Sequence, residues 1–166
     1  MKTSPLQLDE SYVVEIFVKE SGTEASADLK PSDLRIRAEP IYTQSGENPL
    51  KWEVDLTVIF CGSTEKPAPY NGKVVCRGFF TISDTLKEET QKHIVAVNCP
   101  AMLYSTTREI IANLTGRGRF GKMLLPSITF IDERKRFEPE PEAEAEPEEK
   151  PAKRATVKPQ AEVVSD

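Results

Sequence analysis

The sequence is poor in the residues that most often build catalytic and metal sites. It has one histidine, His93, and three cysteines, Cys61, Cys76 and Cys99, with no Cys-x-x-Cys spacing. An odd number of cysteines without such a framework favours a reducing compartment over a disulfide scaffold. His93 has no cysteine or carboxylate partner at a ligand spacing, so we expect a structural histidine. No Ser-His-Asp or Cys-His set can be assembled, and we expect neither an enzyme nor a bound metal or cofactor.

Long apolar runs are also missing. No stretch of 18 apolar residues occurs, and the first residues lack the charged-then-apolar pattern of a secretory signal. We therefore expect a cytoplasmic protein that does not insert into a membrane.

The body of the chain has no excess of positive charge. Residues 137–166 hold 9 of the 27 acidic and 4 of the 22 basic residues, which leaves 18 of each in residues 1–136. A neutral body argues against nucleic-acid binding, which depends on phosphate neutralisation. The last segment is rich in proline and glutamate and has no apolar period, so it predicts a disordered acidic tail. We expect a flexible N-terminus at 1–8, one domain at 9–136 and this tail at 137–166.

Residues 12–18 predict a first strand that is apolar on both faces, because β-branched and aromatic residues fill the run. Apolar residues on both faces indicate either core beneath loops or exposed apolar surface meant for a partner. Strict alternation puts Tyr12, Val14, Ile16 and Val18 on one face, and Val13 and Phe17 on the other.

Three more strands are predicted at 34–38, 50–60 and 74–82, and the one at 50–60 alternates apolar and polar residues most regularly. Pro40 ends the second strand or places it at an edge. Four successive strands joined by loops imply an antiparallel sheet.

Helical patterns begin only after the sheet. Asp84 or Thr85 caps a first predicted helix, and Asn98-Cys99-Pro100 breaks it before a second, which Gly116 ends in a left-handed conformation. The order predicts an α+β fold in which a four-stranded antiparallel sheet is followed by a broken pair of helices packed on one side.

Residues 99–130 carry a family pattern. It consists of Cys99-Pro100, a short apolar run, Arg108-Glu109, an aliphatic helix, Asn113-Leu114, Arg117-Gly118, Phe120, Leu125-Pro126 and a closing Phe130. This order resembles the SecB-type protein-export chaperones, and the strand and helix order matches them over roughly residues 8–130.

The resemblance implies an ATP-independent holdase that keeps precursors unfolded and delivers them to the translocation motor ATPase of the export machinery. It also implies a homotetramer, a dimer of dimers, with the helices at the central interface. The residues that we expect at this interface are Leu103, Ile110, Ile111, Leu114, Tyr12 and Val14. For contact with unfolded clients we expect the apolar side chains that a small core needs least, namely Leu29, Phe120, Met123, Leu124 and Leu125.

Two alternatives remain open. SecB-like proteins continue after the position of Phe130 into an apolar helix, whereas residues 131–136 are charged here. This divergence allows a chaperone of a toxin–antitoxin module that holds an antitoxin. Arg117, Arg119 and Phe120 also allow an RNA-binding adaptor.

The run from Gly116 to Lys122 resembles a phosphate-binding loop, but Met123 stands where that loop needs serine or threonine.

Overall fold

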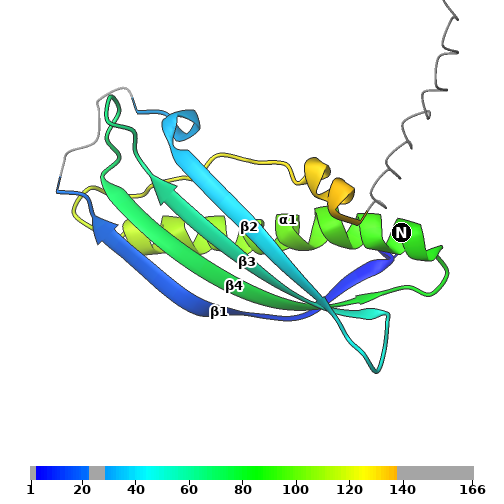
Figure 1. Cartoon of the computed structure of the whole chain (residues 1–166). Helices are drawn as coiled ribbons and strands as arrows, with labels where there is room; N and C mark the ends of the chain where they lie inside the picture. Colours follow the sequence, from blue (N-terminus) through cyan, green and yellow to red (C-terminus); the bar gives the residue numbers. More distant parts are fainter. Residues whose placement is uncertain (1–2, 23–28, 138–166) are drawn as a thin grey trace, which may run out of the picture.

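The computed structural model describes residues 3–22 and 29–137. Four strands are followed by one long helix and a short terminal helical segment (Figure 1). Their order is β1 (Leu6–Glu20), η1 (Pro31–Asp33), β2 (Arg35–Gln44), β3 (Lys51–Cys61), β4 (Tyr70–Ile82), α1 (Glu88–Thr115) and η2 (Ile131–Phe137).

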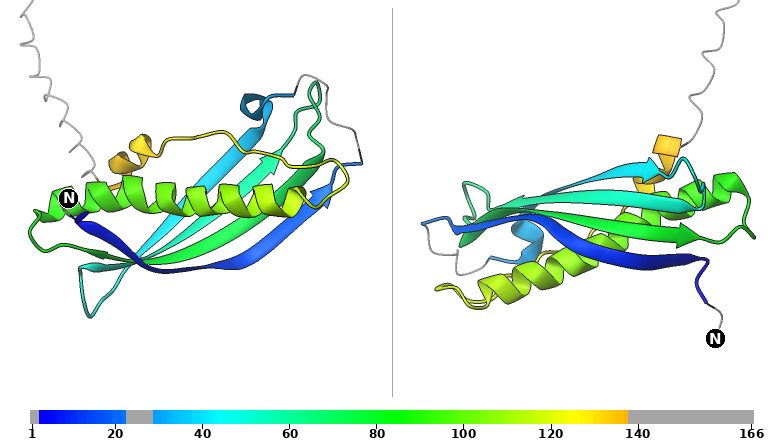
Figure 2. Two further views of the ribbon diagram at one scale, coloured as in Figure 1. Left: turned by 180° about the vertical axis from the view of Figure 1, so that it is seen from behind. Right: turned by 90° about the horizontal axis from the view of Figure 1, so that it is seen from below.

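The strands form one antiparallel sheet in the order β1-β4-β3-β2, which confirms the predicted fold class. β3 and β4 are the two central strands of this order, and every second residue of each is buried, from Trp52 to Phe60 and from Tyr70 to Ile82. β2 is an edge strand, so it continues through Pro40 without losing a ladder hydrogen bond. Figure 2 shows α1 along one face of the sheet, and no described helix covers the other face.

The predicted faces of β1 are wrong because the strand contains β-bulges. Its register against β4 shifts between Val13 and Glu15, so Val14 is an extra residue without a partner. Val13 then lies opposite Cys76 and Ile16 opposite Val74, which are both buried beneath α1. The corrected faces are Val13, Ile16 and Val18 toward α1, and Tyr12 and Phe17 on the opposite side.

The predicted break between two helices is also corrected. α1 runs without interruption from Glu88 to Thr115 and contains Pro100. Proline has no N–H to donate to the carbonyl of Ala96, four residues earlier. The hydroxyl of Tyr42, on β2, donates to that oxygen at 2.8 Å instead. A contact from a distant strand therefore supplies the hydrogen bond that the sequence of the helix cannot.

Close packing of α1 on the sheet depends on a small residue in β4. A Cβ added to Gly78 would lie 2.8 Å from Cδ2 of Leu103 and equally close to the ring of Phe80. Glycine therefore lets the helix approach the strand, and Leu103 becomes a buried part of the core.

The predicted domain limits shift at both ends. β1 begins at Leu6, inside the N-terminus that was expected to be flexible. Phe137 belongs to the folded body, because its ring packs edge-on against Tyr42 and Trp52 at centroid distances of 5.4 and 5.8 Å. The remainder of the predicted tail, 138–166, lies outside the described residues.

Candidate functional site

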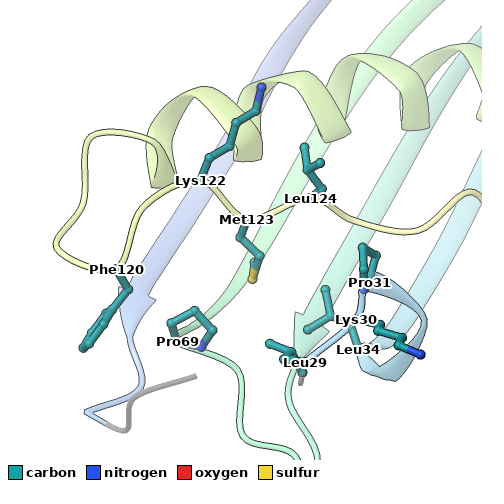
Figure 3. A pocket seen from close by; sticks show the side chains of 9 residues that line it. All are labelled: Leu29, Lys30, Pro31, Leu34, Pro69, Phe120, Lys122, Met123 and Leu124. Atoms are coloured by element: carbon teal, nitrogen blue, oxygen red, sulfur yellow. The ribbon is translucent and has the colours of Figure 1, made fainter. Parts of the chain in front are cut away.

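Three separate segments form an apolar pocket of about 300 Å³ at one end of the sheet (Figure 3). One is the connection between β1 and β2, the second precedes β4, and the third follows α1. Met123 points toward Pro69 and Leu29 from the third segment. The full lining is Leu29, Lys30, Pro31, Leu34, Pro69, Phe120, Lys122, Met123 and Leu124.

Four of the five predicted client contacts meet in this pocket. Leu29 and Phe120 are half-buried, Met123 is buried at 6% exposure and belongs to the hydrophobic core, and Leu124 is 51% exposed at the rim. Leu125 does not line the pocket, because its side chain is buried in the core. Burial alternates along this segment, with Met123 and Leu125 buried and Leu124 exposed, and this alternation could have identified both Met123 and Leu125 as core. Pro69 was missed because it comes from a segment far from the others in the sequence, whereas Lys30, Pro31 and Lys122 neighbour predicted residues.

The third segment, residues 116–124, is called the wall segment below. It leaves α1 at Gly116, whose φ of −61° is right-handed, so the expected left-handed stop is corrected. Positive φ occurs instead at Gly121, at 75°, where glycine is favoured. The N–H of Phe120 donates to Oη of Tyr70 at 3.0 Å, and that of Met123 donates to Oγ1 of Thr115 at 2.9 Å. Both hydroxyls therefore connect the wall segment to the core.

The opposite side of the pocket is organised by Asp33, at the end of η1. Its Oδ2 accepts hydrogen bonds from the backbone N–H of Lys30 and from Nζ of Lys66, each at 3.0 Å. The bond from Lys30, the larger cause, and the bond from Lys66, the smaller cause, hold the pKa of Asp33 below its usual value. An ionised carboxylate thus stabilises the turn that presents Leu29 and Pro31 to the pocket.

The six predicted interface residues do not share one surface. Leu103 and Ile111 are fully buried against the sheet, and Ile110 is half-buried against the same core. Leu114, Tyr12 and Val14 are about half exposed. The exposed part continues along β1, where Val13, Ile16 and Phe17 are also exposed. Of the two interpretations of β1, the structure favours exposed apolar surface.

The cysteines and the histidine show no catalytic arrangement. Cys76 and Cys99 are buried, and burial raises the pKa of both thiols, which keeps them protonated and poorly nucleophilic. His93 lies on α1, and its Nε2 is buried without a hydrogen-bond partner. Among the described residues, no three His, Cys, Asp or Glu side chains are grouped as metal ligands, and no helix is long and apolar enough to span a membrane.

The ring of Phe120 is in contact with two other side chains of this chain. The guanidinium of Arg119 lies 5.4 Å from its centroid, and the ring of Tyr70 meets it edge-on at 6.0 Å. The ring is therefore already engaged within the chain, and no contact of the described residues favours the RNA-binding alternative.

Comparison with known proteins decides the family. Residues 2–132 match the family model described as Preprotein translocase subunit SecB. The chain belongs to the SecB family. The resemblance inferred from residues 99–130 is therefore confirmed, and so is the fold that it implied.

Named SecB relatives align over parts of the chain. A protein-export protein SecB of Acidithiobacillus ferrooxidans is 32% identical over 78 residues, which cover 47% of this chain and 52% of that protein. One from Acinetobacter baylyi is 28% identical over 119 residues, 72% of this chain and 71% of the relative. The chain thus spans about half the length of the first of these SecB proteins.

A solved structure agrees with the SecB fold. The SecB-like chaperone of Mycobacterium tuberculosis, in complex with a peptide from the HigA1 antitoxin, superposes with a TM-score of 0.55 at 15% identity. The match covers 75% of this chain and 91% of the other. At this identity the comparison establishes the fold alone.

The charged segment after Phe130 forms η2 in this SecB family member. Nη1 of Arg136 donates to the carbonyl of Pro40 at 2.6 Å and so covers part of the free edge of β2. The segment therefore folds against the body, although its composition differs from the apolar helix expected of SecB-like proteins.

Proposed function

We propose that this protein is an ATP-independent holdase that binds unfolded precursor proteins and delivers them to the protein-export translocation machinery. The observation that carries the proposal is the pocket, whose mainly apolar lining ranges from the buried Met123 to the half-exposed Leu124, in a member of the SecB family. Methionine repacks against varied apolar partners, which suits a site that must accept many sequences. We propose neither catalysis nor a cofactor.

A pocket of this size holds one or two apolar side chains of an extended chain, so each contact is weak. Burying one large apolar side chain contributes about 1.5–3 kcal/mol before the cost of ordering the client. Useful affinity then requires several pockets acting together on one client. We propose a homotetramer, a dimer of dimers, as the source of this avidity.

The exposed apolar surface supports that assembly. Five exposed apolar residues between Tyr12 and Phe17 lie on both faces of the edge strand β1, and Leu114 on α1 lines one pocket with Ile16. A second copy of the chain would remove this surface from water. We propose a cytoplasmic location, unfolded preproteins as clients and the translocation motor ATPase as the partner that receives them.

A second candidate function is the holding of an antitoxin in a toxin–antitoxin module. It is favoured by the structural match to a SecB-like chaperone that was solved with an antitoxin peptide. The two functions differ in their clients and in the motor. Release of a bound preprotein on addition of the motor ATPase supports export, and tight binding of an antitoxin without such release supports the alternative.

The pocket is tested with two exposed aliphatic residues of similar size. Leu124 lies at the rim, and Ile41, which is 62% exposed, lies on the sheet face away from α1. Leu124→Ser should weaken protection of a chemically unfolded protein from aggregation, with an affinity about tenfold lower. Ile41→Ser should protect as well as the parent chain. Equal protection by both variants would show that clients bind elsewhere.

A further inference from the structure

Two hydroxyl groups from the core hold the wall segment in place. Oη of Tyr70 accepts from the N–H of Phe120 and donates to the carbonyl of Thr115 at 3.3 Å. Oγ1 of Thr115 accepts from the N–H of Met123 and donates to the carbonyl of Ile111 at 2.7 Å. Each hydroxyl is therefore used as both donor and acceptor, and we call the pair the hydroxyl latch.

The latch lies directly beneath the pocket lining. Phe120 and Met123, whose backbones it holds, both line the pocket, whereas Tyr70 and Thr115 do not. Tyr70 and Thr115 are 4% and 1% exposed, so water replaces these hydrogen bonds poorly when they are lost. The latch can therefore affect the pocket without touching a client.

The sequence of the wall segment is suited to this contact. A Cβ added to Gly118 would lie 2.3 Å from Oη of Tyr70, so only glycine lets the segment come down onto the hydroxyl. The ring of Phe120 then packs edge-on against that of Tyr70. Glycines at 116, 118 and 121 leave the free segment many conformations, and the latch selects one of them.

We propose that Tyr70 and Thr115 are positioning residues for client binding, because their hydroxyls hold the wall segment in the conformation that forms the pocket before a client arrives. The inference rests on the proposed function of the pocket. Without the latch, ordering the wall segment becomes part of the cost of binding, and affinity falls while the lining side chains stay the same.

The first test compares two tyrosines that each lose only a hydroxyl. Tyr70→Phe removes one of the two latch hydroxyls, and Tyr104→Phe removes a bond of 2.8 Å to the carbonyl of Pro126, beyond the wall segment. Affinity for a labelled, reduced and alkylated lysozyme is measured by fluorescence anisotropy. Tyr70→Phe should weaken binding about fivefold, and Tyr104→Phe by less than about twofold.

The second test uses a conservative pair at Thr115. Thr115→Val keeps the shape and loses the hydroxyl, so binding should weaken as in Tyr70→Phe. Thr115→Ser keeps the hydroxyl and should restore the affinity of the parent chain. Should Tyr70→Phe melt near the assay temperature, this pair decides the question.

Hydrogen exchange provides a readout that a general loss of stability would not reproduce. Tyr70→Phe should speed exchange at the amide of Phe120, and Thr115→Val at that of Met123, while amides in the middle of β3 stay protected. Parent-like affinity in both variants, or equal weakening by Tyr70→Phe and Tyr104→Phe, would overturn the latch. A Leu124→Ser chain that binds normally would instead count against the pocket itself, so the two failures are distinguishable.

Discussion

The hydroxyl of Tyr42 should contribute to stability mainly because Pro100 has no N–H to donate to the carbonyl of Ala96. Tyr42 donates to the carbonyl of Ala96 at 2.8 Å, and Ala96 is fully buried. Burial, the largest cause, raises the pKa of Tyr42, so the hydroxyl remains a donor at ordinary pH. Tyr42→Phe leaves the carbonyl without a partner, which should lower the free energy of unfolding by about 1–3 kcal/mol.

The background Pro100→Ala tests this reason directly. Alanine at position 100 supplies the N–H that α1 lacks, so the carbonyl of Ala96 gains a donor within the helix. Tyr42→Phe should then cost only about 0.5 kcal/mol, which corresponds to a coupling of about 1–2 kcal/mol between the two sites. The free energy of unfolding of the parent, the two single variants and the double variant is measured by thermal and urea unfolding at one fixed protomer concentration.

A matched tyrosine serves as the control. Tyr104→Phe should cost the same in both backgrounds, because its bond to Pro126 does not involve the helix carbonyl. Additive effects of Tyr42→Phe and Pro100→Ala, within about 0.5 kcal/mol, would refute the explanation of the unbroken helix.

Three further outcomes follow from the packing. Light scattering should report the mass of four chains. Leu114→Arg should reduce that mass, because a charge would be buried at the proposed interface. An unchanged mass would show that Leu114 is not part of the interface. Deletion of 138–166 should leave the melting temperature unchanged, whereas Phe137→Ala should lower the free energy of unfolding by about 1–3 kcal/mol through its contacts with Tyr42 and Trp52; equal melting of both would contradict this packing. The folded-state pKa of Asp33 is depressed, so its stabilisation is present above its unfolded pKa and lost as pH falls. The difference in melting temperature between the parent and Asp33→Asn should therefore shrink below about pH 3.9, and a constant difference would be evidence against the charge.

Strand positions could be predicted where one face is buried. β3 alternates from Trp52 to Phe60, so its period indicated both the strand and its core face. The faces of β1 could not be predicted, because the bulge at Val14 is set by pairing with β4 and inverts every later residue. The helix break was predicted from Asn98-Cys99-Pro100, and this prediction is wrong because the missing donor comes from Tyr42, more than fifty residues away.

The candidate site was predicted in part for a similar reason. Phe120, Met123 and Leu124 lie close together in the sequence, so the wall segment could be recognised from its apolar residues, although Met123 is buried in the core. Pro69 and Leu34 complete the pocket from other segments, and only the fold brings them there. No local sequence pattern marks Tyr70 and Thr115 as latch residues. Their hydroxyls bind the amides of Phe120 and Met123, and Tyr70 lies fifty residues from Phe120.

Site-specific photo-cross-linking to an unfolded client tests the central claim most directly. A photoreactive amino acid at Leu124, which is 51% exposed, lies at the pocket rim, and one at Ile41, which is 62% exposed, lies on the far face of the sheet. With the reduced and alkylated lysozyme as client, the account predicts cross-links from position 124 that unlabelled client competes away, and few from position 41. Equal cross-linking at both positions, or cross-linking at position 41 alone, would contradict the assignment of this pocket as the client site.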